Sequence, residues 1–358
     1  MRVAIVGTRT AAPTSDDRRL ADALRAAGVE VVEVVWDTLA DPDGRSSPDV
    51  PVAPDGAVVD DGVALDGALH GAALALVRAA PADPDERERF LAWAAAAAER
   101  TALLSPVDVL RWNTHRSYLL ELEDRGAPVM PTAWLAHGDR VALADLLELR
   151  GWREVELLPA VGPRGAARVD GGAAGLTLEA GQQHLDALLA HGDALVRLRP
   201  SSLAREGSWT VVVVDGEVSH AVRTLPPDGR AGPGGAGLGG AGLGGAGRGR
   251  AGRGRAGRGG AGDDGVIATA VDAPAIDGDL ARLATWVVEA TAADGLALAT
   301  VELVADDTGT PQLVALDAVA PELHLGVRPG AAPAMASAVL RAAGIVGPSS
   351  GRHADERG

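Results

Sequence analysis

Two short apolar runs flank a helical pattern at the start of the chain. Residues 2–7 and 29–36 are apolar runs of strand length, and leucine and alanine recur at helical spacing over residues 20–27. Ser15 is a suitable N-cap for this helix, and Gly28 is suited to end it. Because a strand, a helix and a strand in that order build a parallel sheet, we expect a parallel α/β unit here.

The middle of the chain alternates between helical and strand patterns. A helix over residues 112–125 is expected to open at Asn113 or Thr114, and a Gly-rich turn spans residues 162–175. The periodicity also predicts helices at 86–100, 179–189 and 280–292, and strands at 128–131, 155–159 and 194–198.

Two β-hairpins carry the clearest turn signals in the sequence. The first runs over residues 209–222 and turns at Asp-Gly, residues 215–216, a dipeptide that favours the tightest hairpin turn. The second joins strands at 296–305 and 312–319 through the polar turn 306–309.

The second hairpin brings four side chains onto one face. With the turn centred near residues 308–309, Glu302 faces Ala315 across the two strands. Since residues two apart share a face of a strand, Thr300, Glu302, Ala315 and Asp317 form one patch. Two carboxylates remain in this patch, and Mg²⁺ is commonly held by one or two carboxylates together with phosphate oxygens and water.

A low-complexity segment of glycine, alanine and arginine spans residues 229–262. It contains six arginines and no acidic residue before Gly262, and it cannot bury a core, so we expect a disordered loop. Arg-Gly tracts bind nucleic acid where aromatic side chains accompany them for stacking, and this one has none. We therefore favour an expanded coding repeat over RNA binding.

Composition narrows the chemistry further. The 358 residues are 47% hydrophobic, which is enough for a packed core, and the formal net charge of −16 opposes general nucleic-acid binding. There is no cysteine, so disulfides and thiolate chemistry are excluded, and all 33 basic residues are arginine. No N-terminal secretion signal and no membrane-length apolar run is visible, so we expect a cytoplasmic protein.

Four groups of residues together point to a family. They are 111–120 with 126–132, 158–161, 206–209 with 215–223, and 301–304 with 316–323. In order and spacing these segments resemble the ATP-grasp ligases, the superfamily of glutathione synthetase and D-alanine–D-alanine ligase. Within that superfamily they are most similar to the bacterial ligases of the cycloserine-pathway type.

The resemblance implies an ATP-grasp fold, α/β overall and α+β in its grasp subdomains, with an N-terminal parallel-sheet domain. The expected domains are 1–105 for the N-terminal pre-ATP-grasp domain, 106–195 for the central A subdomain, and 196–346 for the B subdomain, interrupted by loop 229–262. Residues 347–358 are expected to form a flexible tail.

The resemblance also implies a site for ATP and Mg²⁺ between two subdomains. A substrate carboxylate would attack the γ-phosphate to give an acyl phosphate, which an amine or a thiol then captures. The implied residues are Arg116 for the phosphates, the hinge Val196, Arg197, Leu198 and Arg199 for adenine, Glu206 for ribose, Arg223 as the catalytic contact to the substrate carboxylate or phosphate, and Glu302 and Asp317 for the metal.

Some of these residues have an alternative interpretation. Arg223 is either that substrate contact or an ordinary surface arginine. Glu206 either holds ribose or orders the hairpin, and the alternative is an exposed loop acid. His115 and His220 are interpreted as structural, because the eight histidines show no metal-ligand spacing.

Several positions depart from the family pattern. Leu158 stands where the family usually has a phosphate-binding lysine, so its charge is missing unless Arg164 or Arg168 reaches the site from the Gly-rich turn. Ala315 stands where the family has an acidic metal ligand. Residues 67–76 lack an aromatic stretch that the family pattern leads us to expect near there.

Three hypotheses follow from these observations. The first to be considered is an active ATP- and Mg²⁺-dependent ligase that joins a small carboxylate to an amine or a thiol. The second, which the departures favour, is an ATP-grasp protein that binds nucleotide but has weakened or lost ligase chemistry. The third, and least favoured, is nucleic-acid association through loop 229–262.

Overall fold

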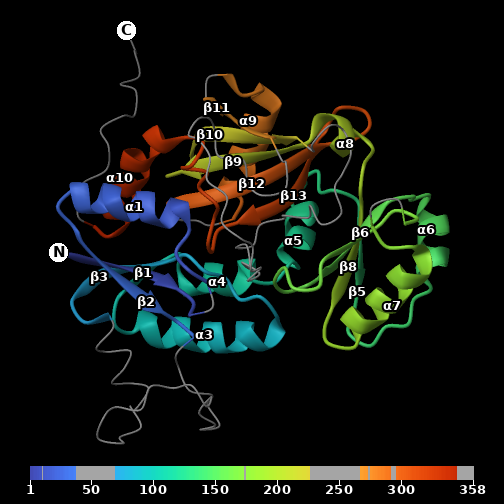
Figure 1. The fold of residues 1–358 in the computed structure, drawn as a ribbon, viewed down its shortest axis with the longest axis horizontal. Helices are drawn as coiled ribbons and strands as arrows, with labels where there is room; N and C mark the ends of the chain where they lie inside the picture. The colour runs from blue at the N-terminus through green and yellow to red at the C-terminus, as the bar shows by residue number, and fades with distance from the viewer. Residues whose placement is uncertain are drawn as a thin grey trace, which may run out of the picture.

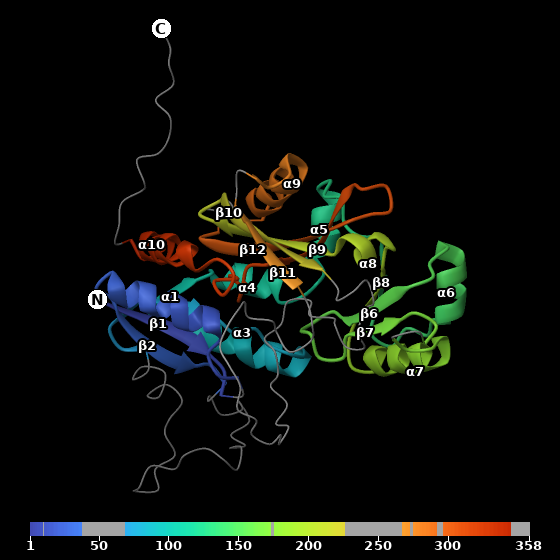
Figure 2. The same cartoon turned by 45° about the horizontal axis from the view of Figure 1, so that its top comes forward.

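The structure is a computed structural model that describes residues 1–9, 11–37, 69–172, 175–225, 267–272, 275–291 and 296–344. The Gly/Arg-rich segment 229–262 and the tail 347–358, for which we expected a disordered loop and a flexible end, lie outside the described residues. Within the described part of the chain, three β-sheets lie side by side and helices cover their faces (Figures 1 and 2).

The N-terminal sheet is parallel, as the strand–helix–strand pattern predicts. Its strand order is β2-β1-β3-β4, and every neighbouring pair runs in the same direction. The strands are β1 (Arg2–Gly7), β2 (Glu30–Val35), β3 (Ala72–Val77) and β4 (Ala102–Leu104). Alternate residues face opposite layers: Val3 packs toward α1 (Ser15–Ala26) and α10 (Ala332–Ala342), whereas Ala4 and Val6 pack toward α3 (Pro84–Ala98).

The N-cap of helix α1 lies one residue earlier than predicted. Thr14, and not Ser15, is the N-cap: its hydroxyl accepts from the Asp17 amide at 3.1 Å, and the Asp17 carboxylate accepts from the Thr14 amide at 2.8 Å. This reciprocal capping box satisfies two backbone donors at the helix start, which a cap at Ser15 would not do.

A second sheet is formed by the middle of the chain. Its order is β5-β8-β6-β7, with all pairs antiparallel, and α6 and α7 cover one face (Figure 1). The elements are β5 (Thr132–Leu135), α6 (Leu143–Arg150), β6 (Val155–Pro159), β7 (Ala167–Val169), α7 (Leu178–Leu189) and β8 (Ala194–Leu198). We call this the small sheet.

A third, five-stranded antiparallel sheet has the order β11-β10-β9-β12-β13. Its strands are β9 (Ser208–Val214), β10 (Glu217–Leu225), β11 (Ile267–Asp272), β12 (Leu298–Ala305) and β13 (Pro311–Asp317). Helices α5 (Tyr118–Asp124) and α9 (Gly278–Glu289) cover one face, through residues such as Leu119 and Ala284. We call this the large sheet; α8 (Ser202–Glu206) connects the small sheet to it.

Both predicted hairpins are present in the large sheet. Strands β9 and β10 pair antiparallel, and Asp215 and Gly216 between them have φ of 51° and 79°. Positive φ at both central residues is the requirement of the tight turn that Asp-Gly favours.

The predicted helix over residues 112–125 is wrong in one respect, because the structure breaks it into two. Helix α4 (Val107–Asn113) ends before a bend, and α5 resumes at Tyr118. At the bend the amide of Arg116 donates to the carbonyl of Ala160 at 2.8 Å. This tertiary hydrogen bond replaces the helical one, and helical periodicity alone does not reveal it.

The strand predicted at residues 128–131 is also displaced, to β5 at Thr132–Leu135. Pro128 and Pro131 have no amide donor and cannot join a ladder at both edges. Met130 instead donates to the carbonyl of Leu313, and Leu313 donates to the carbonyl of Pro128. The segment therefore lies against β13 and links the two antiparallel sheets.

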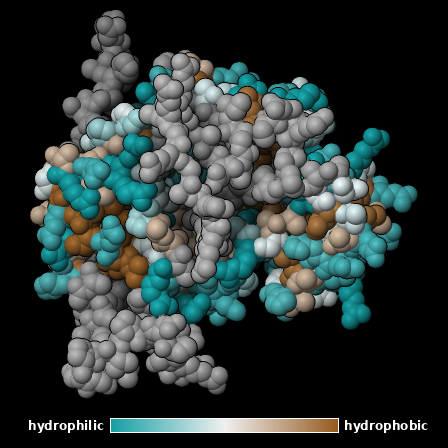
Figure 3. Space-filling view, in the orientation of Figure 1, coloured by the Kyte–Doolittle hydropathy of each residue, from teal (hydrophilic) through white to brown (hydrophobic). Residues whose placement is uncertain are grey.

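The observed architecture matches the expected fold class, with an N-terminal parallel sheet followed by antiparallel sheets. One expected domain boundary, at 195/196, falls inside β8, which pairs with both β5 and β6. Helix α10, from the end of the expected B subdomain, packs on α1 of the N-terminal sheet. On the face shown in Figure 3, hydrophobic residues gather over the N-terminal sheet, and smaller hydrophobic spots lie among hydrophilic residues on the side of the small sheet.

Candidate functional site

The predicted carboxylate patch is present on the large sheet. Glu302 pairs with Ala315, and Thr300 pairs with Asp317, across β12 and β13. This is the register derived from the hairpin turn, so the prediction that these side chains share one face is confirmed. Glu302 and Asp317 are both partly buried, whereas Ala315 offers no oxygen ligand between them.

A β-bulge lies next to Glu302. The register shifts between Glu302 and Leu303, so Val314 is an extra residue on β13. An extra residue of this kind leaves its backbone groups outside the ladder. Here the carbonyl of Val314 accepts a hydrogen bond from Nη1 of Arg197 at 3.0 Å, across from the small sheet. The Arg197 side chain thus spans the space between the two antiparallel sheets, beside Glu302.

A buried carboxylate holds Arg197 in this position. Both Nε and Nη2 of Arg197 donate to Oε2 of Glu156, at 3.2 and 2.7 Å, and Nη1 of Arg199 donates to Oε1 of the same residue at 3.3 Å. Glu156 and Arg197 are 7% and 4% exposed, so this pair is shielded from water. The sequence places them 41 residues apart, and no local motif signals the pair.

Arg116, the predicted phosphate contact, approaches the same space from the bend between α4 and α5. Its Nη1 donates to the carbonyls of Pro159 and Gly162, at 2.6 and 2.8 Å. Burial lowers its pKa to about 10, and the charges of Arg197, Glu156 and Glu302 act on it. The guanidinium remains charged at neutral pH, and it fixes the loop that follows β6.

Burial also controls the state of the two carboxyl groups. Burial raises the pKa of Glu302 to about 7, although the positive charges of Arg197 and Arg116 oppose the rise. Burial raises the pKa of Asp317 too, against hydrogen bonds from the amides of Ala320 and Val319 and the charge of Arg78. The site therefore holds a carboxyl group that exchanges its proton near neutral pH, as sites that bind cations often do.

Leu158 is part of the hydrophobic core and makes no polar contribution. It is 1% exposed and packs with Leu195 and the large-sheet core. Neither arginine proposed as a substitute for the missing lysine reaches the patch. Arg164 pairs with Asp83 and Glu86 at the start of α3, and Arg168 pairs with Glu154 and Asp170. Arg197, which enters from the strand beside Leu158, is the additional cation that the structure brings to Glu302.

Arg223 lies on the other face of the large sheet from the carboxylates. Glu302 pairs with Thr210, which pairs with Val222, so these three share a face, and Arg223 as the next residue points the opposite way. Its Nε donates to the carbonyl of Glu206 at 2.8 Å, and its guanidinium lies over the ring of Trp209. Arg223 and Glu206 thus contact each other and hold the entry to β9.

Two backbone amides of the predicted hinge, residues 196–199, form hydrogen bonds within the protein. The amide of Leu198 donates to the carbonyl of Pro131, and the amide of Arg199 donates to the carbonyl of Glu154, both at 2.9 Å. These hydrogen bonds keep the end of β8 extended, with Val196 buried in the small-sheet core. The side chains of Arg197 and Arg199 both donate to the Glu156 carboxylate.

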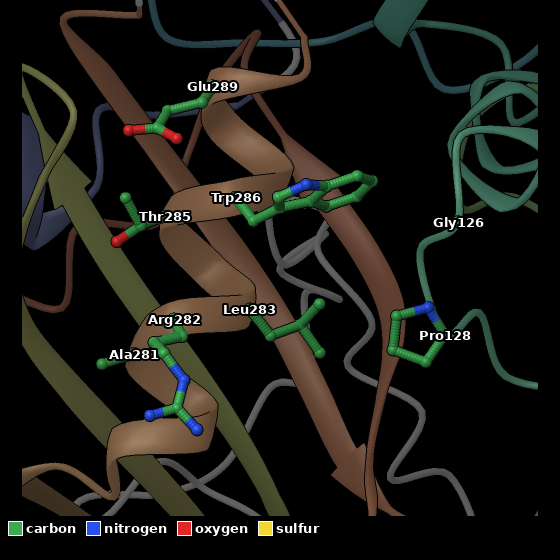
Figure 4. A pocket seen from close by; sticks show the side chains of 8 residues that line it. All are labelled: Gly126, Pro128, Ala281, Arg282, Leu283, Thr285, Trp286 and Glu289. Carbon is green, nitrogen blue, oxygen red and sulfur yellow. The ribbon is translucent and has the colours of Figure 1, made fainter.

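A separate groove lies beside α9, away from the carboxylate patch. It has a volume of about 670 Å³ and runs between α9 and the segment that follows α5. Figure 4 shows Leu283 and Trp286 of α9 on the side of Pro128. Because α9 covers the face of the large sheet opposite to Glu302, this groove is distinct from the carboxylate patch.

No family model matches the sequence. Over 155 residues the chain is 31% identical to the cycloserine biosynthesis protein DcsG of Streptomyces lavendulae, a match that covers 40% of this chain and spans half the length of that relative. The crystal structure of D-cycloserine synthetase DcsG superposes with a TM-score of 0.68 at 23% identity, covering 96% of this chain and 100% of that one. The chain has the ATP-grasp fold.

A further ATP-grasp structure agrees with this assignment. The ligase PsnB, in a complex with a precursor variant, Mg and ADP, superposes with a TM-score of 0.58 at 14% identity, covering 95% of this chain and 98% of that one. The ATP-grasp resemblance drawn from four sequence segments is confirmed for the fold. The side chains that sequence reasoning missed are Arg78 and Glu156, which lie outside the four segments, and Tyr118, which lies within the first segment but was given no role.

None of the helices in the described part of the chain has the length and apolar character needed to cross a bilayer. Among the same residues, no group of three or more His, Cys, Asp and Glu side chains is placed to hold a metal ion. Glu302 and Asp317 are the two carboxylates that could hold a divalent cation here, with water and other oxygen ligands in its remaining positions.

Proposed function

We propose that this ATP-grasp protein binds ATP with Mg²⁺ between its small and large sheets and retains weak or no ligase chemistry. Arg116 and Arg197 would hold the phosphates, and Glu302 and Asp317 would hold one Mg²⁺. The hinge 196–199 and Glu206 would contact the nucleoside, and Arg223 would act through its contact with the Glu206 carbonyl.

The donor set suits this pair of ligands. Carboxylate oxygens are the ligands that Mg²⁺ takes, and it keeps water and phosphate oxygens in its remaining positions. Arginine is a suitable partner for phosphate, because its planar fork donates to two oxygens at once. When bound, the cation would neutralise charge on the transferring phosphoryl group, which is the main electrostatic requirement of this chemistry.

The pairing of Glu302 with Ala315 carries the proposal. At the position where the family pattern has an acidic ligand, the ladder presents a methyl group, and Leu158 is buried in the core. Compared with the family pattern, Ala315 therefore leaves the metal ligands one negative charge short, and Leu158 leaves the phosphate contacts one positive charge short. This supports binding of one cation with reduced affinity, and it does not support a tight two-metal site.

Calorimetric titration separates binding from catalysis. ATP should bind in the presence of millimolar Mg²⁺, and Glu302→Ala should weaken that binding at least tenfold. ADP release measured with mixtures of small carboxylates and amines should stay at the level seen without them. Absence of ATP binding at any Mg²⁺ concentration would remove the proposal.

An active ligase is the second candidate, and Arg197 favours it. Its guanidinium supplies a buried positive charge beside Glu302 where the core residue Leu158 supplies none. In addition, the relative DcsG is a cycloserine biosynthesis protein. ADP release that depends on a carboxylate and an amine, and that disappears in Glu302→Ala, would establish this alternative over the first.

A further inference from the structure

The loop after β13 is held by side chains from outside the large sheet. The amide of Leu316 donates to the Tyr118 hydroxyl at 3.0 Å, and the amide of Ala318 donates to Oδ1 of Asn113 at 2.8 Å. The carbonyl of Ala318 accepts from the Ser105 hydroxyl at 2.6 Å. All of these contacts are buried, and they surround Asp317.

Asp317, the last residue of β13, is tied to this loop. Its Oδ1 accepts from the amides of Val319 and Ala320, both at 2.9 Å. These two hydrogen bonds set the direction of the carboxylate, because they tie one of its oxygens to the backbone that follows. The position of the 318–321 backbone therefore determines where the second oxygen can face.

Arg78 fixes the far end of the same loop. It lies directly after β3 of the N-terminal sheet, is 8% exposed, and donates from Nη1 to the carbonyl of Pro321 at 2.7 Å. Its Nε donates to Oδ1 of Asp17 at 2.6 Å, and this pair is buried. The other oxygen of Asp17 accepts from the amide and hydroxyl of Thr14, both at 2.8 Å.

These contacts form a continuous chain from the first turn of α1 to Asp317. It runs from Thr14 through Asp17 and Arg78 to the carbonyl of Pro321. The backbone just before Pro321 donates the hydrogen bonds that the Asp317 carboxylate accepts. A buried arginine is suited to this position, since its planar fork donates in two fixed directions at once, toward a carboxylate and toward a carbonyl. The elements it joins are 243 residues apart in the sequence.

We propose that Arg78 is a positioning residue for the metal site, because it fixes the loop after β13 and so directs the Asp317 carboxylate. This inference rests on the proposed function only for the metal; the ordering of the loop is a property of the protein alone. Residues that orient metal ligands from behind typically affect metal affinity by 10–100-fold when replaced.

Two measurements on the full-length protein test this role. In the nucleotide-free protein, Arg78→Met should speed hydrogen exchange at the amides of Val319 and Ala320 by about tenfold or more, and leave the amides of β9 unchanged. In titrations with Mn²⁺ and ADP, it should weaken Mn²⁺ binding by about 10-fold or more, with ADP binding in EDTA unchanged.

Conservative and control variants give the comparison. Arg78→Lys keeps the positive charge but cannot donate to both Asp17 and the Pro321 carbonyl in fixed directions. Relative to Arg78→Met, it should recover part of the Mn²⁺ affinity and little of the protection of the Val319 and Ala320 amides from exchange. Arg25→Met, at an exposed position on α1, the helix that carries Asp17, should behave as wild type in both measurements. If Arg78→Met does not fold, Asp17→Asn removes the charge that orients Arg78 and is measured in its place.

The outcomes are distinguishable. Unchanged exchange at Val319 and Ala320, or a loss of Mn²⁺ affinity matched by an equal loss of ADP affinity, would overturn the positioning role. If wild type binds no Mn²⁺ with ADP, the proposed function fails; faster exchange in Arg78→Met would then still establish that Arg78 orders the loop.

Discussion

Glu302 lies opposite Ala315 on the β12–β13 ladder, two pairs along from Thr300 and Asp317. This relationship limits the carboxylates on the patch to two and places a methyl group at its centre. Beside it, the bulge at Val314 frees a carbonyl that Arg197 binds from the other sheet. The patch thus has a cation from the small sheet where a third acidic ligand is missing.

Replacing Ala315 by glutamate should restore that missing ligand. Without metal, two carboxylates facing each other across a ladder repel, so Ala315→Glu should lower the melting temperature. With Mg²⁺ and ATP the loss should be recovered and the apparent ATP affinity should rise about tenfold. Thermal unfolding with and without Mg²⁺ measures both effects. Ala315→Gln has the same size without the charge and should show no Mg²⁺-dependent recovery.

Breaking the buried Glu156–Arg197 pair should destabilise the fold strongly. Arg197→Leu leaves the Glu156 carboxylate buried with only the longer contact from Arg199, and removal of one partner of a buried pair costs about 3 kcal/mol or more. The double variant Glu156→Leu/Arg197→Leu should recover most of that loss. Urea unfolding of the three proteins gives the comparison. A double variant no more stable than Arg197→Leu alone would show that the pair is not what stabilises this junction.

His220 should make the protein less stable in acid. Burial, together with the charges of His324 and Arg328, lowers its pKa from 6.5 to about 4, and the charge of Asp16 opposes this change. Because the folded state holds this histidine neutral, its contribution is fully present above pH 6.5 and is lost as the pH falls toward 4.

The size of the effect can be measured by substitution. The unfolding free energy of wild type relative to His220→Asn should fall by roughly 2–3 kcal/mol between pH 7.5 and pH 4.5. His191→Asn, which changes an exposed histidine, should show no such difference. A constant difference between wild type and His220→Asn across this range would mean that His220 titrates normally.

Glu302 should link nucleotide binding to pH. With its pKa at about 7, the carboxyl must lose a proton before it can bind Mg²⁺. The ratio of ATP–Mg²⁺ affinities of wild type and Glu302→Gln should therefore rise about tenfold from pH 6 to pH 8. Taking this ratio removes the titration of ATP itself, and calorimetry at the two pH values measures it.

In the protein without ligands, the raised pKa of Glu302 makes folding stability decrease as the pH rises. Because the folded state binds the Glu302 proton more tightly than the unfolded state, the stabilising contribution of this residue is present below pH 4.5 and is lost as the pH rises through about 7. Glu302→Gln should remove this decrease. A wild-type protein whose stability relative to Glu302→Gln does not fall between pH 5 and pH 8 would contradict the assignment.

Local patterns were sufficient for some parts of this structure. The Asp215-Gly216 turn and the register of Glu302 with Ala315 could be predicted, because turn chemistry and strand alternation act over a few residues. The four segments that resemble ATP-grasp ligases predicted the fold. Residues 302 and 317 could thus be placed together before the structure was known.

Long-range contacts account for what the sequence did not predict. The bend at Arg116 depends on the carbonyls of Pro159, Ala160 and Gly162, which lie more than 40 residues away. The position of the Arg197 side chain depends on a bulge in a different sheet. Contacts of this kind are set by packing between sheets, and neither periodicity nor propensity contains them.

Titration of ATP in the presence of Mg²⁺ into wild type, Glu302→Ala, Arg116→Ala and Arg150→Ala tests the central claim most directly. Arg150 is exposed on α6 and serves as the matched arginine control. Saturable binding to wild type and Arg150→Ala, weakened at least tenfold in the other two variants, is the predicted result. Equal heats for all four proteins, or no saturable binding to any of them, would contradict a nucleotide site between the two antiparallel sheets.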